Sequence, residues 1–115
     1  MINWSVALEM TGGDEMLLAQ VIGAFQEETP TLMANIREAI SKRDTTLLHR
    51  AAHTLKTSLW SLGATVSGNT AFALEQLAGD GRLDEVDALC AALESQMPPI
   101  YAELDRYVRE KHGTG

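Results

Sequence analysis

His53 has the clearest chemical potential in this sequence, because it is expected to stand exposed on a rigid helix. The apolar residues around it recur at about 100° per residue, which places one set on a common side of that helix: Leu48, Ala52, Leu55, Leu59 and Leu62. His53 projects from the opposite side. An imidazole changes charge near neutrality, so at pH 7 much of it is neutral and nucleophilic. An exposed imidazole in this setting is suited to carrying a phosphoryl group.

Other polar or aromatic side chains share this side of the helix. Within about 60° of His53 lie His49, Lys56, Thr57 and Trp60. Lys56, one turn after His53, would offset the negative charge of a phosphoryl group on the imidazole. A carboxylate or amide on a neighbouring helix would hold the other ring nitrogen and fix the tautomer. Glu75 and Gln76 lie in a suitable stretch for this role.

The histidines have two other possible interpretations, as solvated surface residues or as metal ligands. On periodicity alone, a histidine on a polar helix face is most often solvated surface. His49 and His53 are four residues apart, which is the spacing at which two imidazoles on one helix share a metal ion. The sequence offers no third or fourth ligand nearby, and Cys90 falls on an apolar stripe. We therefore expect no metal site, and we expect His49 to be a surface residue that adds positive charge near His53.

The bulk composition favours one globular domain over residues 1–115, with residues 113–115 as a disordered tail. The 9 basic residues are scattered and the net charge is −7, which argues against a nucleic-acid binder. The longest apolar runs fall far short of the roughly 20 residues that cross a bilayer, so no direct membrane contact is expected. A single cysteine, Cys90, cannot form an internal disulfide, which favours a reducing cytoplasm.

Six helical segments are predicted, and the first three begin at capping signals. Asn3 caps a short helix through about Glu9, and Asp14 starts the second helix. Thr29 followed by Pro30 predicts a third start, with threonine as the cap and proline in the first turn. These signals divide the first 43 residues into three helices.

The remaining three predicted segments complete the bundle. Asp44 caps the helix that carries His53, and Gly63 marks the turn into the next one. That helix covers residues 64–78, with its inner side formed by Val66, Thr70, Leu74 and Leu77. The last segment covers residues 83–111, and Pro98-Pro99 must either kink or split it. No strand alternation is seen, so the sequence predicts an all-α antiparallel helical bundle with short connections.

The residues around His53 resemble the histidine-containing phosphotransfer (HPt) domain. The signature of that family runs His-x-Leu-Lys-Gly-Ser, followed several residues later by Leu-Gly-Ala. At the matching spacing this chain has His53, Leu55, Lys56, Ser58, Leu62, Gly63 and Ala64. Residues 4–14, residues 25–30 and Leu74-Glu75 also resemble their counterparts, so the similarity extends over nearly the whole chain.

The resemblance implies a four-helix bundle with additional short N-terminal helices and a phosphohistidine intermediate in a two-component phosphorelay. His53 would accept a phosphoryl group from an aspartate of a response-regulator receiver domain and pass it to another receiver. Lys56 would be its charge partner, and Glu75 would orient the imidazole. The receiver would supply Mg²⁺, so the chain needs no cofactor of its own and is not an enzyme by itself.

The same resemblance implies the partners and the setting. Receiver domains and a sensor histidine kinase are the expected partners, and the module is expected to be monomeric. We expect it in the cytoplasm, either alone or as the cytoplasmic part of a membrane-bound hybrid sensor kinase.

Two residues depart from the family pattern. Thr57 stands where the family usually has glycine, and Trp60 stands where it tends to have a small residue. With His49 they would form the face that docks a partner, although Trp60 could instead fold back over a neighbouring helix as ordinary packing. The departures keep an alternative open: an HPt-like adaptor that binds receiver or kinase domains without carrying phosphate. A third hypothesis is a helical adaptor in which His53 is incidental.

Overall fold

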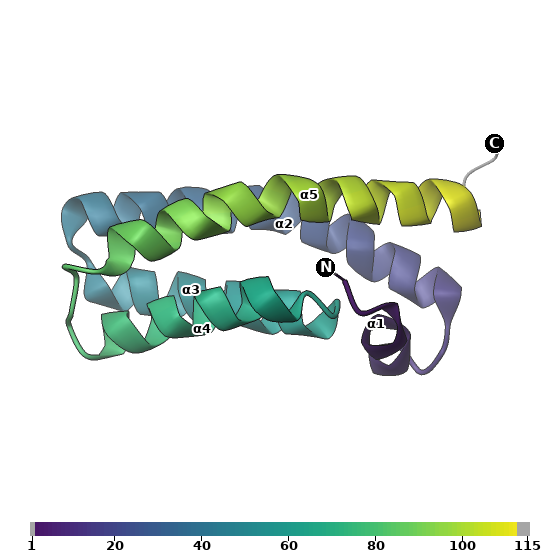
Figure 1. Ribbon diagram of the computed structural model, residues 1–115, viewed down its shortest axis with the longest axis horizontal. Helices are drawn as coiled ribbons and strands as arrows, with labels where there is room; N and C mark the ends of the chain where they lie inside the picture. Colours follow the sequence, from purple (N-terminus) through teal and green to yellow (C-terminus); the bar gives the residue numbers. More distant parts are fainter. Residues whose placement is uncertain (1, 113–115) are drawn as a thin grey trace.

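The computed structural model describes residues 2–112, which form five α-helices and no strand (Figure 1). The helices are α1 (Trp4–Met10), α2 (Glu15–Lys42), α3 (Thr45–Ser61), α4 (Thr65–Gly79) and α5 (Val86–His112). The prediction of an all-α bundle is confirmed, with one short helix, α1, ahead of four long ones. The expected disordered tail, residues 113–115, lies outside the described residues.

The four long helices form two layers in an elongated molecule of 46 × 23 × 19 Å. Figure 1 shows α2 beside α5 in the upper layer and α3 beside α4 in the lower one. Each long helix packs against the next along the chain, and α5 closes the bundle against α2. Because short connections join successive helices, neighbours in sequence run antiparallel. Helix α1 lies below the ends of α2 and α5 that extend past the lower layer (Figure 1).

Three helices begin at side-chain caps, as predicted. The side chains of Asn3, Asp14 and Asp44 each accept hydrogen bonds from backbone N–H groups in the first turn of the helix that follows. These bonds satisfy donors that would otherwise have no partner at a helix start. Asp44 thereby fixes where α3 begins.

The predicted break at Thr29-Pro30 was wrong, because α2 runs through it without interruption. Thr29 is completely buried rather than placed as a cap. Its hydroxyl donates to the carbonyl of Phe25, one turn earlier, and also forms a hydrogen bond with the hydroxyl of Tyr101 on α5. Pro30 lies on the exposed side of α2, where water can hydrate the carbonyl that lacks its N–H partner.

Replacing Thr29 with valine should lower the free energy of unfolding by about 1–2 kcal/mol, since both of these hydrogen bonds are lost at nearly constant shape. Urea unfolding followed by circular dichroism measures the change. If the hydroxyl pair is responsible, Tyr101→Phe should have a much smaller effect in the Thr29→Val background than in wild type. Equal effects in the two backgrounds would contradict this interpretation.

The inner side of α4 also differs from the prediction. Val66 is 68% exposed, Thr70 and Leu77 are half-buried, and of the four predicted residues Leu74 alone is fully buried. The buried side is formed mainly by small residues, with one carboxylate among them: Ser67, Gly68, Ala71, Leu74, Glu75 and Ala78. Small side chains let α4 approach α3 closely. Hydrophobic periodicity does not detect such a face, because Gly, Ser and Ala contribute little to a hydrophobic pattern.

Pro98 and Pro99 do not split α5, which continues from Val86 to His112. Both prolines are exposed, whereas Met97 and Ile100 on either side of them are buried. The core-facing contacts of α5 therefore continue through the proline pair. Cys90 is part of this core, as predicted, and its burial raises the pKa of its thiol.

The turn between α3 and α4 requires the glycine predicted there. Gly63 has a φ of 75°, and a Cβ at this position would lie 2.2 Å from the carbonyl oxygen of Asn3. The carbonyl of Gly63 accepts a hydrogen bond of 2.8 Å from the N–H of Asn3. This close backbone contact joins the lower layer to the segment that precedes α1.

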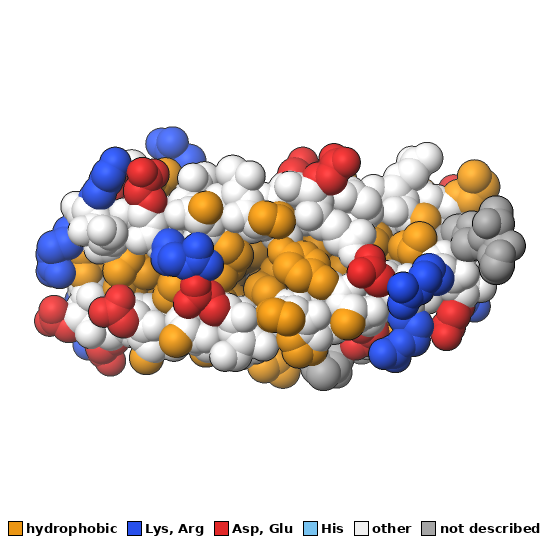
Figure 2. Space-filling model, turned by 90° about the horizontal axis from the view of Figure 1, so that it is seen from above, with side chains coloured by type: hydrophobic (Ala, Val, Ile, Leu, Met, Phe, Trp, Pro, Cys, Tyr) orange, Lys and Arg blue, Asp and Glu red, His pale blue; other side chains and the backbone are white. Residues whose placement is uncertain are grey.

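The outer face of the upper layer has a mixed surface. Figure 2 shows hydrophobic side chains along the line between α2 and α5, with acidic and basic side chains on both sides. No helix within residues 2–112 combines the length and the hydropathy that a membrane span requires.

Candidate functional site

Helix α3 presents His53 to solvent from the side opposite the core. The side chain of His53 is 56% exposed, and His49, one turn earlier, is also exposed. The leucine side of the helix is buried at every predicted position: Leu48, Ala52, Leu55, Leu59 and Leu62. The amphipathic pattern read from the sequence is therefore confirmed.

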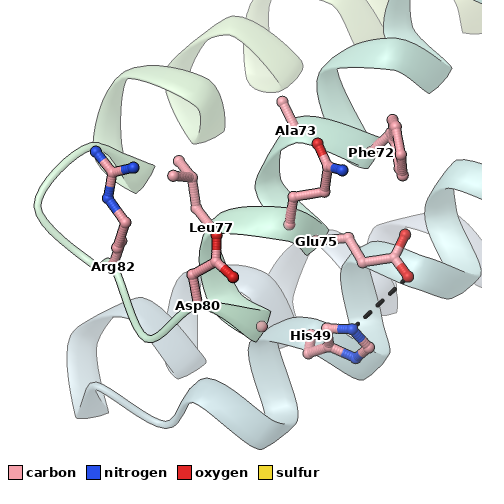
Figure 3. Close-up of a pocket in the computed structure, with 9 residues that line it drawn as sticks. His49, Phe72, Ala73, Glu75, Leu77, Asp80 and Arg82 are labelled. Atoms are coloured by element: carbon pink, nitrogen blue, oxygen red, sulfur yellow. Dashed lines mark ion pairs between the residues drawn. The ribbon is translucent and has the colours of Figure 1, made fainter.

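The carboxylate of Glu75, on α4, contacts three side chains of α3. Its Oε2 lies 2.8 Å from Nδ1 of His53 and 3.7 Å from Nε2 of His49. Its Oε1 lies 2.7 Å from Nζ of Lys56. The side chain of Glu75 is only 12% exposed, and Figure 3 shows its carboxylate pointing toward the ring of His49. One buried acid thus joins two imidazoles and an ammonium group.

Glu75 remains ionised in this position. Burial alone would raise the pKa of its carboxyl group, but the contacts with Lys56 and His53 together outweigh burial, so the pKa lies below the ordinary 4.5. An ionised carboxylate only accepts hydrogen bonds, so the contact assigns the proton to Nδ1 of His53. In the neutral ring, Nε2 then carries the free lone pair. The site presents a nucleophilic nitrogen on the side of the ring away from Glu75.

Lys56 is not an ordinary surface lysine, because its side chain is only 13% exposed. Its Nζ lies 5.4 Å from the centroid of the Trp60 ring and 5.2 Å from that of the Phe72 ring. A cation removed from water needs partners to offset the lost hydration. Here Glu75 supplies the opposite charge, and the two rings supply cation–π contacts.

The side chain of Trp60 folds over α4, which agrees with the prediction that it packs on a neighbouring helix. Its Nε1–H donates a hydrogen bond of 3.1 Å to Oδ1 of Asn69. Its ring covers Gly68, where a Cβ would come within 2.1 Å of the indole. The ring of Phe72 packs against it with centroids 5.7 Å apart. Trp60 is nevertheless 37% exposed, so part of the indole is open to solvent beside the site.

Thr57 is exposed one turn after His53, and its hydroxyl is occupied within its own helix. The hydroxyl donates a hydrogen bond of 3.1 Å to the backbone carbonyl of His53. The polar end of Thr57 is therefore directed along α3 rather than toward the imidazole.

The structure distinguishes the two residues proposed to hold the ring. Glu75 contacts His53, whereas its neighbour Gln76 is exposed. Phe72, Gly68 and Asn69 were not anticipated as parts of the site. A glycine inside a helical pattern is a signal of close approach by another group, and Gly68 carried that signal.

An open cleft of 620 Å³ lies beside these side chains, along α4 and the loop that follows it. Figure 3 shows Phe72 near one end of the cleft and Arg82 near the other, with His49 and Glu75 along its edge. Among the side chains that the structure describes, no group of three His, Cys, Asp or Glu is arranged to hold a metal ion.

A comparison with known protein families matches most of this chain to one family. Residues 20–107 match the sequence model of a family described as "Hpt domain". The match covers well over half of the chain and includes α3, α4 and all the site residues described above. No curated protein and no solved structure matches the chain.

Proposed function

The chain belongs to the Hpt domain family, and on that basis we propose that His53 carries a phosphoryl group in a two-component phosphorelay. Members of this family are phosphocarrier modules rather than classical enzymes, and they interact with receiver domains and histidine kinases. In our proposal the group arrives from an aspartate of one receiver and leaves to another. The 2.8 Å contact between Nδ1 of His53 and Glu75 carries the proposal, because it leaves Nε2 as the free nucleophile.

In the proposed step, the lone pair of Nε2 attacks the phosphorus of an aspartyl phosphate. A P–N bond forms, the P–O bond to aspartate breaks, and the aspartate departs with the electron pair as a carboxylate. The proton on Nδ1 stays in place, so the ring gains positive charge as the P–N bond forms. Glu75 contacts Nδ1 and would stabilise this charge. Attack by the aspartate of a second receiver reverses the step and restores the neutral ring.

The other site residues would support this chemistry. Lys56 keeps Glu75 ionised and in place, and its charge offsets that of the phosphoryl group. His49, Thr57 and Trp60 are exposed around His53 and would contact the docked receiver. The chain would contribute the nucleophile and the docking face as a monomeric cytoplasmic module, while Mg²⁺ would be bound by the receiver.

Chemical phosphorylation with phosphoramidate tests the proposal without a protein partner. We expect an acid-labile phosphoryl group on His53 alone, identified by phosphorus NMR and by mass spectrometry of peptides. His49 and His112 are internal controls in the same sample. A receiver domain with Mg²⁺ should then remove the label. A folded protein that is not labelled on His53 but still binds receivers would support the adaptor alternative instead.

Replacing Glu75 with glutamine should slow labelling by about 10–100-fold, by analogy with the loss of carboxylates that orient metal-binding histidines. An amide can donate as well as accept, so it no longer enforces the tautomer with a proton on Nδ1. The labelling rate should fall by less than the roughly 10⁴-fold that follows replacement of the buried aspartate in a catalytic triad, because water can reach the half-exposed His53. Phosphorus NMR gives the labelling rate.

Glu38→Gln is the matched control for this variant. It removes a carboxylate from an ion pair with Lys42 on α2, outside the site. It should label at the wild-type rate. A Glu75→Gln variant that also labels at that rate would show that Glu75 does not orient the ring.

A further inference from the structure

We infer that Trp60 and Phe72 are positioning residues for His53: they hold Lys56 against Glu75 and thereby keep Nε2 free to react. The role rests on the proposed function of His53. It assigns a task to the aromatic pair at the α3–α4 contact. Neither ring needs to touch the phosphoryl group or a receiver to perform it.

Trp60 is held against α4 from two directions. The absence of a Cβ at Gly68 lets the indole lie directly on the helix backbone, and the bond from Nε1 to Asn69 fixes its orientation. Phe72, one turn after Gly68 on the same helix, packs against the indole at an interplanar angle of 52°. Two rings from two helices therefore meet in a fixed arrangement.

The ammonium of Lys56 is within cation–π distance of both rings. A lysine side chain has a flexible four-carbon stem and a strongly hydrated head, so it normally extends into water. Here both rings lie close to the ammonium, and the side chain is only 13% exposed. Without them, the ammonium would regain water and its contact with Oε1 of Glu75 would loosen.

A weaker contact between Lys56 and Glu75 would also affect His53, because both side chains contact the same carboxylate. Oε1 and Oε2 belong to one rigid group, so a change at Lys56 reorients the oxygen that accepts from Nδ1 of His53. His49 already lies 3.7 Å from Oε2 and would compete for it. The imidazole of His53 would then exchange between tautomers, and the fraction with a free Nε2 would fall.

The test separates positioning from docking by using a small donor. In Trp60→Leu and Phe72→Leu, an apolar side chain remains but the ring face is lost. We expect phosphoramidate to label His53 about two- to fivefold more slowly in each, which matches the loss of one cation–π contact. Nitrogen NMR of the imidazole should show a gain of the tautomer with a proton on Nε2. Phe72→Tyr keeps the ring and should restore both readouts.

Gly68→Ala gives an independent perturbation, because the added Cβ must displace Trp60. We expect it to slow labelling in the same way. Gly23→Ala on α2 is the matched control, since a Cβ there meets nothing within 4 Å. Circular dichroism confirms that each variant is folded before its rate is interpreted.

The possible outcomes are distinct. Unchanged labelling and an unchanged tautomer, with slower transfer from a receiver, would mean that the rings only dock the partner, and would overturn the inference. Failure of wild type to be labelled would instead overturn the proposed function. The tautomer measurement tests the aromatic pair in either case, because it needs no phosphoryl group.

Discussion

Replacing His53 with glutamine is expected to abolish phosphoryl transfer through this protein while leaving its fold intact. Glutamine has no nucleophilic ring nitrogen, yet its amide can still donate a hydrogen bond to Glu75. The side chain of His53 is more than half exposed, and His53 does not belong to the leucine core. The free energy of unfolding should therefore change by less than about 0.5 kcal/mol.

Two measurements check this prediction on the same sample. Phosphoramidate should give no acid-labile label on the His53→Gln variant, and a phosphorylated receiver with Mg²⁺ should not transfer its group to it. His49→Gln is the matched control, because it removes the neighbouring imidazole and should still be labelled on His53. A loss of stability of several kcal/mol in His53→Gln would identify a structural histidine. Labelling of that variant at the wild-type rate would place the reactive residue elsewhere.

Much of α3 could be predicted because its signals are local. The leucine stripe has the helical period, and the cap at Asp44 fixes the start of the helix. Together they determine that His53 faces away from the core. Glu75 and Gln76 could both be proposed as its partner from their place on the neighbouring helix, and the resemblance to the HPt domain favoured Glu75, which the structure places against His53.

What could not be predicted depends on contacts between distant residues. Thr29 has the local signature of a helix cap, yet it is buried inside α2 because its hydroxyl meets Tyr101, which is 72 residues away. Lys56 likewise has a distant neighbour, because its ammonium lies 5.2 Å from the ring centroid of Phe72 on another helix. A propensity or a capping motif records only the neighbours along the chain. Tertiary packing decides such positions.

Replacing Lys56 with methionine is expected to lower the free energy of unfolding by about 2–4 kcal/mol at neutral pH, because a buried carboxylate loses its cation. Methionine keeps an unbranched apolar stem that can pack on Trp60 and Phe72, so the loss reports mainly the charge. The value should lie toward the lower end of the range for broken buried pairs, since Glu75 keeps its hydrogen bond to His53.

The sign of the pH dependence follows from Glu75. In wild type its pKa lies below the ordinary 4.5, so its stabilising contribution is complete above that value and is lost as the pH falls through the folded-state pKa. In the variant, Lys56 no longer opposes the effect of burial, so the pKa of Glu75 should be higher than in wild type, and the resulting penalty is relieved as the pH falls. His49 and His53 face the same carboxylate in wild type, and the substitution removes neither of them. The stability difference should therefore be largest near neutrality and should narrow toward about pH 4.

The double variant Lys56→Met/Glu75→Gln separates charge from packing. With both charges removed, no unpaired carboxylate remains, so the double variant should be more stable at neutral pH than Lys56→Met alone. Its stability should also lose the pH dependence that Glu75 causes. Urea unfolding at several pH values measures both effects. Equal losses in the single and double variants at every pH would mean that Lys56 does not stabilise the protein by neutralising Glu75.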